Sequence, residues 1–130
     1  MNAYILIDPH FSDITPSSRK DDFFEAILSK VLYVKSLMSP GDKMIFSGDL
    51  FEKPHISDRK LYQLCESLPD ECYSVVGNHD VPRLAKSRIK DSSLGILFAS
   101  GLVKPLVREA FGGFSFVGID FDDDPTVIDV

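Results

Sequence analysis

The sequence predicts one α/β domain built around a mostly parallel sheet, with crossover helices and a C-terminal hairpin. Three short stretches, residues 3–7, 43–47 and 72–76, are mainly apolar, and the first is apolar throughout. Such runs are typical of strands covered on both faces of a parallel sheet. The two segments between them carry apolar residues at helical spacing. A β–α–β–α–β order of this kind requires right-handed crossovers, which place the helices against the sheet.

Composition narrows the class of protein. The chain has 130 residues, of which 44% are hydrophobic, so one domain, residues 1–130, with a real core is expected. Its net charge of −6 argues against a protein that coats nucleic acid through charge alone. Bound divalent ions would nevertheless reverse the sign of the charge locally.

Targeting and redox signals favour a cytoplasmic protein that does not enter a membrane. No apolar run approaches the roughly 20 residues that span a bilayer, and the first residues do not read as a secretion signal. In such a reducing compartment we expect Cys65 and Cys72 to be buried thiols rather than a disulfide or a redox pair.

The first strand ends in Asp8-Pro9-His10. Proline removes a backbone donor and stops the strand. Asp8 and His10 are two residues apart, so in extended backbone they point the same way and could bind one ion. The alternative is an ordinary turn with a solvated aspartate.

The first helix is expected to begin near Ser17 or Ser18, either of which could be its N-cap. Its apolar positions lie between residues 23 and 38, and residues 39–41 end it. The second strand then ends at Gly48.

Asp49 follows that glycine, which lets backbone approach a ligand closely. Two apolar residues come next and suggest a loop that returns to the core, whereas His55 reads as exposed rather than as a ligand. Ser57 is the expected N-cap of a second helix, and residues 69–70 end it. The apolar face of this helix is formed by Leu61, Leu64, Cys65 and Leu68.

The third strand ends in residues 77–80, where three polar side chains follow a glycine. Asn78 offers an amide oxygen, His79 an imidazole, and Asp80 a carboxylate that can orient the imidazole. Open α/β sheets bind ligands beyond the carboxyl ends of their strands. This loop is therefore the strongest single candidate for a site.

Taken together, three strands deliver metal-capable side chains to one edge of the sheet. Oxygen and imidazole donors without thiolate suit Mn²⁺, Fe²⁺ or Zn²⁺ in a hydrolytic site. A carboxylate between two ions can bridge them, and ions about 3.5–4 Å apart are common in phosphoester hydrolysis. The candidate ligands are Asp8, His10, Asp49, Asn78 and His79.

The remaining segments are less specific. Residues 83–90 are basic, and they are either solvated or in contact with a phosphate backbone. Ser92 or Ser93 can cap a short helix that ends at Gly101. Residues 102–110 and 114–119 flank two glycines and predict a hairpin. The aspartates of residues 120–124 could hold an ion, but we favour a solvated loop.

The three strand-end motifs, in this order and spacing, resemble those of the calcineurin-like metallophosphoesterase superfamily. Residues 48–51, Gly-Asp-Leu-Phe, look more like the SbcD-type DNA-repair exonuclease branch than the protein phosphatases. Residues 92–103 are also similar to the segment that follows the Asn-His-Asp motif in those nucleases. The resemblance extends from residue 3 to about residue 107.

The resemblance implies a fold, a reaction and a role for each residue. Asp8 and His10 would bind a first ion, Asp49 would bridge two ions, and Asn78 would bind the second. His79 would act near the leaving group, with Asp80 holding its imidazole. The ions would be two divalent metals, by analogy manganese. The substrate would be the phosphodiester of DNA, an ATPase would be the partner, and the fold would be the αββα sandwich.

The chain also departs from that family. Family members carry further histidines, including a Gly-His-x-His motif, whereas this chain has three histidines and none beyond residue 79. It therefore reads as the N-terminal portion of the phosphoesterase domain, without a C-terminal half that would complete the second ion site and the second sheet.

Two explanations stay open. In the first, the chain belongs to a split nuclease whose complementary half is another piece. In the second, it is a shortened, catalytically incomplete relative that binds or regulates, for example by self-association through an uncovered sheet face. Within the enzymatic reading, a phosphatase acting on another phosphoester is a further alternative.

Overall fold

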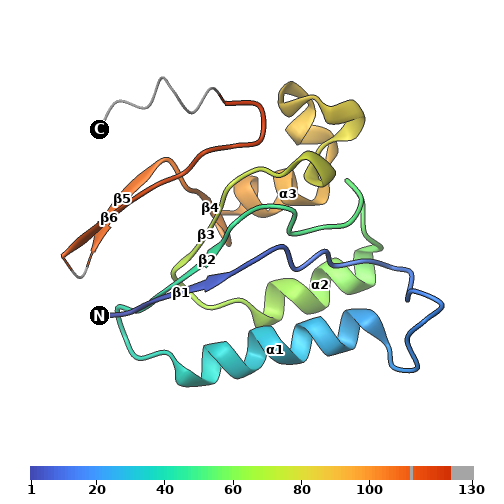
Figure 1. Ribbon diagram of the computed structural model, residues 1–130, viewed down its shortest axis with the longest axis horizontal. Coiled ribbons are helices and arrows are strands. Elements are labelled where there is room, and N and C mark those ends of the chain that lie inside the picture. Colours follow the sequence, from blue (N-terminus) through green and yellow to red (C-terminus); the bar gives the residue numbers. More distant parts are fainter. Residues whose placement is uncertain (112, 124–130) are drawn as a thin grey trace.

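The computed structural model describes residues 1–111 and 113–123 and has an α/β architecture (Figure 1). A four-stranded parallel sheet has the order β1-β2-β3-β4, and β5 and β6 form a separate antiparallel hairpin. The helices and strands are β1 (Ala3–Leu6), α1 (Phe23–Leu37), β2 (Lys43–Phe46), α2 (Asp58–Ser67), β3 (Cys72–Ser74), α3 (Ser93–Ser100), β4 (Lys104–Pro105), β5 (Arg108–Phe111) and β6 (Phe114–Val117).

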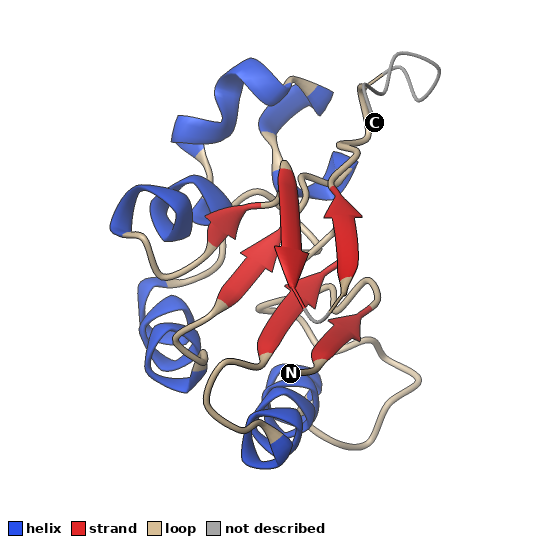
Figure 2. Ribbon diagram, turned by 90° about the vertical axis from the view of Figure 1, so that its left-hand side faces the viewer, coloured by secondary structure: helices blue, strands red, loops and turns tan. Residues whose placement is uncertain are grey.

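The core lies mainly on one face of the sheet. Figures 1 and 2 show α1 and α2 along that face, with the hairpin on the opposite side. Side chains from the three helices pack there against β2, and Phe24, Val31, Leu64, Leu94, Met44 and Phe46 are among the buried ones. The expected α/β order with parallel strands and crossover helices is confirmed.

The start of α1 differs from the prediction. Asp22, rather than Ser17 or Ser18, is the N-cap, and its side chain accepts a hydrogen bond from the Glu25 amide at 3.1 Å. The preceding loop is held by contacts of its own, because the Thr15 hydroxyl accepts from the Phe23 amide at 3.1 Å. These contacts delay the first helical turn by several residues.

The start of α2 and the two ends of α3 follow the prediction more closely. Ser57 is the N-cap residue of α2, although its side chain makes no capping hydrogen bond. Ser92 caps α3 by accepting from the Gly95 amide at 3.0 Å. Gly101 ends α3 in the left-handed conformation at φ 78°, which glycine adopts without steric cost.

The segment 102–110 is not one arm of a hairpin, as predicted, but two short strands. β4 adds to the parallel sheet beside β3, and the Leu106 amide donates to the Ser74 carbonyl at 2.9 Å. Pro105 cannot donate to a ladder, so it suits the edge position that β4 occupies. The hairpin itself is β5–β6, and of the two predicted turn glycines, Gly112 lies outside the described residues.

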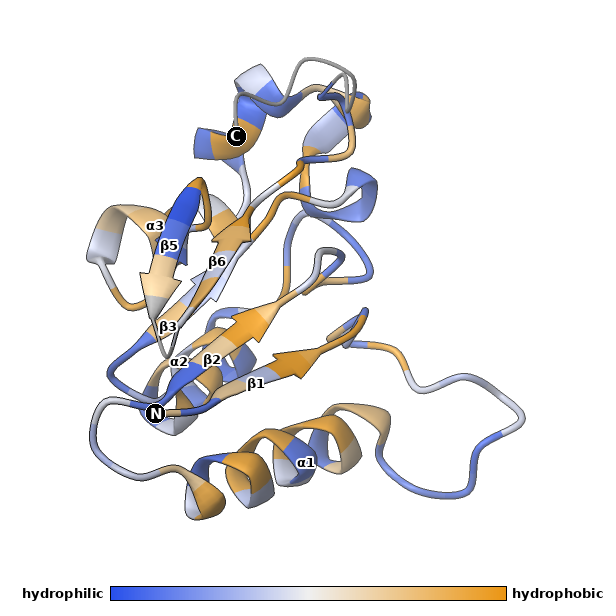
Figure 3. Ribbon diagram, turned by 60° about the vertical axis from the view of Figure 1, so that its left-hand side comes forward, coloured by the Kyte–Doolittle hydropathy of each residue, from blue (hydrophilic) through white to orange (hydrophobic). Residues whose placement is uncertain are grey.

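The second face of the sheet is covered only in part. A small cluster of Ile45, Tyr73, Val75 and Leu106 is buried there, with Phe116 of the hairpin packed against it. At the other edge β1 has no neighbour beyond β2 among the described residues, and Ile5 remains 54% exposed. Figure 3 shows β1 and β2 as apolar along most of their length. The uncovered surface predicted for this face is thus confined to the β1 side.

Candidate metal centre

The loops after β1 and β2 run side by side because their backbones are hydrogen-bonded to each other. The amide of His10 donates to the Asp49 carbonyl at 3.0 Å, and the amide of Phe11 donates to the Leu50 carbonyl at 2.8 Å. Phe11 and Phe51 form an isolated parallel bridge, and both side chains are buried. The two apolar residues after Asp49 do return to the core, as predicted, and they anchor this loop.

This pairing brings together three of the predicted ligands. Ligand atoms of Asp8, His10 and Asp49 lie within 4.8 Å of one another, and His10 Nε2 is 3.9 Å from Asp49 Oδ2. The carboxylates of Asp8 and Asp49 concentrate negative charge beside one imidazole. This donor set suits a divalent cation of the Mn²⁺, Fe²⁺ or Zn²⁺ type.

The same three residues have unusual backbones. Asp8, His10 and Asp49 adopt the left-handed conformation, with φ of 43°, 53° and 45°. Among the described residues, only Arg83 and Leu84 are other non-glycine residues with positive φ. Such backbones cost about 1–2 kcal/mol each and persist where the surroundings impose them, often at functional sites.

The loop after β3 holds the Asp49 carboxylate from a third side. The His79 amide donates to Asp49 Oδ1 at 3.0 Å. The Asn78 amide nitrogen, in the orientation that satisfies its neighbours, donates to both carboxylate oxygens at 3.3 Å. A Cβ on Gly77 would collide with the Asp49 carboxylate and amide, so only glycine permits this approach.

Asp80 does not hold the His79 imidazole, as the resemblance implied, but binds backbone amides instead. Its side chain is fully buried and accepts hydrogen bonds at 2.9 Å from the amides of Phe51 and Gly77. Burial raises the pKa of Asp80 to about 6, while the two hydrogen bonds lower it and the charge of Asp49 raises it further. Asp80 thus joins the loop after β2 to the loop after β3. The described contacts of its carboxylate do not include the His79 imidazole.

Glu52 meets both histidines, and the sequence reasoning missed it. Its backbone carbonyl lies 2.9 Å from His79 Nδ1, and its Oε2 lies 2.6 Å from His10 Nδ1. The second approach is close but lacks hydrogen-bond alignment, so this buried nitrogen has no hydrogen-bond partner among the described atoms. The available signal was position, since Glu52 directly follows the two apolar anchors of its loop.

The spacing of the cluster fits a divalent cation, because ligand atoms of two carboxylates and one imidazole, from Asp8, Asp49 and His10, lie within 4.8 Å of one another. The donor types fit as well, because every predicted first-ion ligand is present in the cluster. For a second ion the described residues offer Asp49 and Asn78, and the Asn78 amide nitrogen faces Asp49. The structure therefore fits one ion better than two.

The basic stretch and the acidic tail meet each other. Lys86 forms an ion pair with Asp120 and a longer one, 3.6 Å, with Asp123. Asp120 Oδ1 also accepts from the Val76 amide at 2.7 Å. The expectation of a solvated loop is wrong for Asp120, which fastens the tail beside the β3 end. Asp124 lies outside the described residues.

Of the remaining predicted residues, His55 and Cys72 behave as expected, whereas Cys65 is only half-buried. His55 is exposed and stands apart from the ligand clusters. Cys65 and Cys72 are free thiols, and burial raises the pKa of Cys72 to about 12, which makes that thiol unreactive. Among the described residues, no helix combines the length and the apolar character that a membrane crossing requires.

A cavity of about 610 Å³ opens beside the cluster, between the end of β1 and α1. Asp8, His10 and Glu52 contribute its polar wall, and apolar side chains of α1 together with Lys30 form the opposite side. Space for a substrate therefore adjoins the candidate ligands. Comparisons with protein-family models and with curated proteins find no match for this chain.

Proposed function

We propose that this chain is a metal-dependent phosphoesterase that hydrolyses phosphodiesters, with DNA as the substrate. The observation that carries the proposal is the convergence of Asp8, His10 and Asp49, each in a left-handed backbone, at the carboxyl ends of two parallel strands. Backbone strain concentrated on three clustered polar residues is often retained for function.

The donor set supports divalent-metal chemistry. Asp8, His10 and Asp49 would hold the first ion, and Asp49 with Asn78 would contribute to a second; manganese is the proposed metal. A bound divalent ion would polarise the phosphoryl group and stabilise negative charge in the transition state. The choice of DNA rests on the resemblance of residues 48–51 and 92–103 to the nuclease branch.

The protein's own residues would position the reaction. The His79 amide and the Asn78 side chain orient the Asp49 carboxylate. Asp80 accepts a hydrogen bond from the Phe51 amide, which joins the loop after β3 to the loop after β2. The His79 ring is half exposed next to the cluster, where its Nε2, when protonated, would donate to the leaving group or to a developing negative charge.

A binding or regulatory role is the second candidate. It is favoured by the small number of described ligands for a second ion, and by the uncovered β1 edge with Ile5 and Ile7 exposed. A split nuclease, in which a complementary piece or an ATPase partner completes the enzyme, would use the same edge. In either case the first ion site would still form.

The test is Mn²⁺-dependent cleavage of linear DNA, run beside bis(p-nitrophenyl) phosphate as a diester and p-nitrophenyl phosphate as a monoester. We expect diester cleavage that Asp8→Asn abolishes and that Asp70→Asn, an exposed aspartate outside the cluster, leaves unchanged. Monoester cleavage alone would indicate a phosphatase. Mn²⁺ binding without any cleavage would favour the binding role, and absence of both would exclude the enzyme.

A further inference from the structure

We propose that Glu52 is the positioning residue for both candidate histidines: its carboxylate sets the ring of His10 and its backbone carbonyl sets the ring of His79. The two contacts are 2.6 Å from Oε2 to His10 Nδ1 and 2.9 Å from the carbonyl oxygen to His79 Nδ1. This inference deepens the proposed function and rests on it only for its metal-binding consequence.

The tautomer of His79 follows from its partner. A carbonyl oxygen can only accept a hydrogen bond, so Nδ1 of His79 must carry the proton. In the neutral ring the lone pair then belongs to Nε2. His79 can therefore offer Nε2, but not Nδ1, to a cation or a substrate.

The same reasoning applies to His10 through charge. Nδ1 of His10 is buried and lies 2.6 Å from a carboxylate oxygen, and a negative charge at that distance favours a proton on the nearer nitrogen whether or not the two groups are aligned. The lone pair is then on Nε2, which is 3.9 Å from Asp49 Oδ2. Metal-binding histidines commonly donate their other ring nitrogen to a carboxylate or carbonyl in this way.

Residue 52 can serve two rings because its own amide and the amide before it are both held by hydrogen bonds. The Glu52 amide donates to the Phe11 carbonyl at 2.9 Å, and the preceding amide, of Phe51, donates to Asp80 at 2.9 Å. The rings of His10 and His79 meet edge to face with centroids 5.2 Å apart. The ligand atoms of His10, Glu52 and His79 lie within 4.8 Å of one another, and residue 52 contacts both rings, so the trio is an orienting network in which each ring keeps its Nε2 for an ion.

Nitrogen-15 NMR of the imidazoles tests this directly and needs no metal. The chain has three histidines, and the exposed His55 is an internal reference for an unconstrained ring. At a pH of about 8.5, above the ordinary histidine pKa, we expect His10 and His79 as the Nδ1–H tautomer.

Two substitutions separate the two contacts. In Glu52→Ala we expect His10 to change toward the Nε2–H tautomer while His79 keeps its own, because its acceptor is backbone. Glu52→Gln removes the charge but keeps an oxygen acceptor, so the His10 tautomer should change less than in Glu52→Ala. An Nε2–H tautomer of either ring in the wild type, an unchanged His10 in Glu52→Ala, or a change of both rings in that variant would overturn the proposal.

Mn²⁺ titration supplies the second readout. We expect Glu52→Ala to weaken binding about 10- to 100-fold, as loss of an orienting group does, and Glu52→Gln to weaken it less. Glu66→Ala, which removes an exposed carboxylate of α2, is the matched control and should change nothing. A wild type that binds no Mn²⁺ would refute the proposed function, while the tautomers would still decide the role of Glu52.

Discussion

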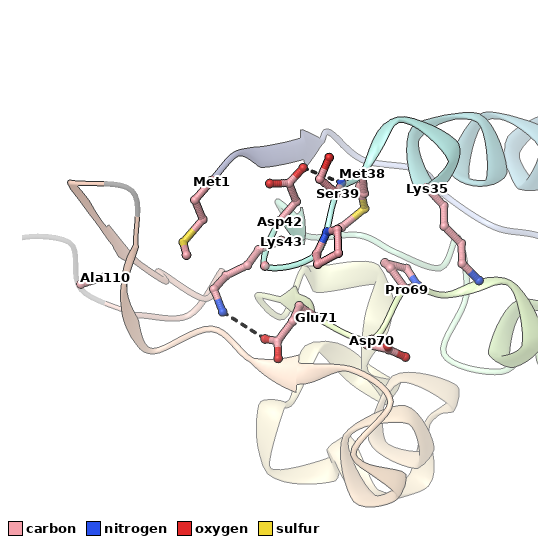
Figure 4. A pocket seen from close by; sticks show the side chains of 12 residues that line it. Met1, Lys35, Met38, Ser39, Asp42, Lys43, Pro69, Asp70, Glu71 and Ala110 are labelled. Atoms are coloured by element: carbon pink, nitrogen blue, oxygen red, sulfur yellow. Dashed lines mark hydrogen bonds and ion pairs between the residues drawn. The ribbon is translucent and has the colours of Figure 1, made fainter.

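The two ends of the parallel sheet both gather charged side chains, but they do so in opposite ways. The amino ends of β2 and β3 lie beside a hollow of about 960 Å³ that Lys43, Asp42 and Glu71 help to line (Figure 4). At the carboxyl side, the end of β1 lies beside the smaller cavity next to Asp8 and His10. The larger hollow is therefore not the one beside the candidate ligands.

At the amino end, opposite charges meet and polar groups are satisfied. Lys43 Nζ lies 3.0 Å from Glu71 Oε2, and the Tyr73 hydroxyl donates to the same oxygen at 3.2 Å. Asp42 accepts from the amides of Asn2 and Ser39 at 2.8 Å, and these hydrogen bonds lower its pKa. These are the contacts of a surface that stabilises the fold.

At the carboxyl end, like charges meet and the backbone is strained. Asp8 and Asp49 share a small volume, and both have positive φ without being glycine. At the amino-end hollow the residue with positive φ is a glycine, Gly41, for which that conformation costs little. The comparison indicates that the groups at the carboxyl end destabilise the fold, whereas those at the amino end stabilise it. This is the pattern expected of a functional site.

The largest effect should come from Asp49→Asn. Loss of this charge should weaken Mn²⁺ binding more than about 100-fold, since changes behind the ligands alone cost about 10- to 100-fold. Glu71→Gln, the same chemical change at the amino end, should leave binding unchanged. Calorimetric titration of both variants makes the measurement, and equal affinities would remove the distinction between the two ends.

Gly77→Ala should reduce both binding and stability. The added Cβ would displace Asp49, and we expect a loss of about 1–3 kcal/mol in unfolding free energy together with weaker Mn²⁺ binding. Gly101→Ala is the control, because its φ of 78° is strained for alanine but nothing lies within 4 Å. It should lower stability by about 1–2 kcal/mol without affecting the metal. Similar Mn²⁺ affinities in the two variants would contradict the close-approach argument.

Asp8→Gly should separate strain from function. Relief of the left-handed backbone contributes about 1–2 kcal/mol, and glycine's extra unfolded-state entropy offsets about 0.5–1 kcal/mol. We therefore expect unfolding free energy to rise by up to about 1 kcal/mol while Mn²⁺ binding falls. Asp70→Gly, at an exposed residue without positive φ, should be destabilising instead. Chemical denaturation of both variants decides whether the strain is real.

The smallest effect should be that of Glu71→Gln on stability. Lys43 lowers the pKa of Glu71 chiefly through their hydrogen bond, so the pair stabilises the fold above the ordinary glutamate pKa and loses that contribution as pH falls through the lowered pKa. The carboxylate is partly exposed, so we expect less than about 1 kcal/mol, reduced further by salt. Thermal unfolding between pH 3 and pH 7 should show a weaker pH dependence in the variant. An unchanged pH profile would show that the pair contributes nothing.

Prediction from the sequence succeeded where the determining interactions are local or follow from strand direction. The helix and strand order follows from apolar spacing, and the Ser92 cap and the Gly101 stop are local signals. The meeting of His10 with Asp49 was predictable because parallel strands end at one edge. It failed for the N-cap of α1, where Thr15 binds the Phe23 amide from eight residues away.

The order of secondary structure and the chemical type of the candidate ligands were determined by the sequence alone, because hydrophobic periodicity and donor chemistry belong to the residues themselves. Only the tertiary structure decided which groups hold those ligands. Asp80 meets an amide 29 residues away, Asp120 meets one 44 residues away, and Glu52 meets both histidines through contacts that span separate loops. Such partners are selected by how the loops pack, and no local pattern encodes them.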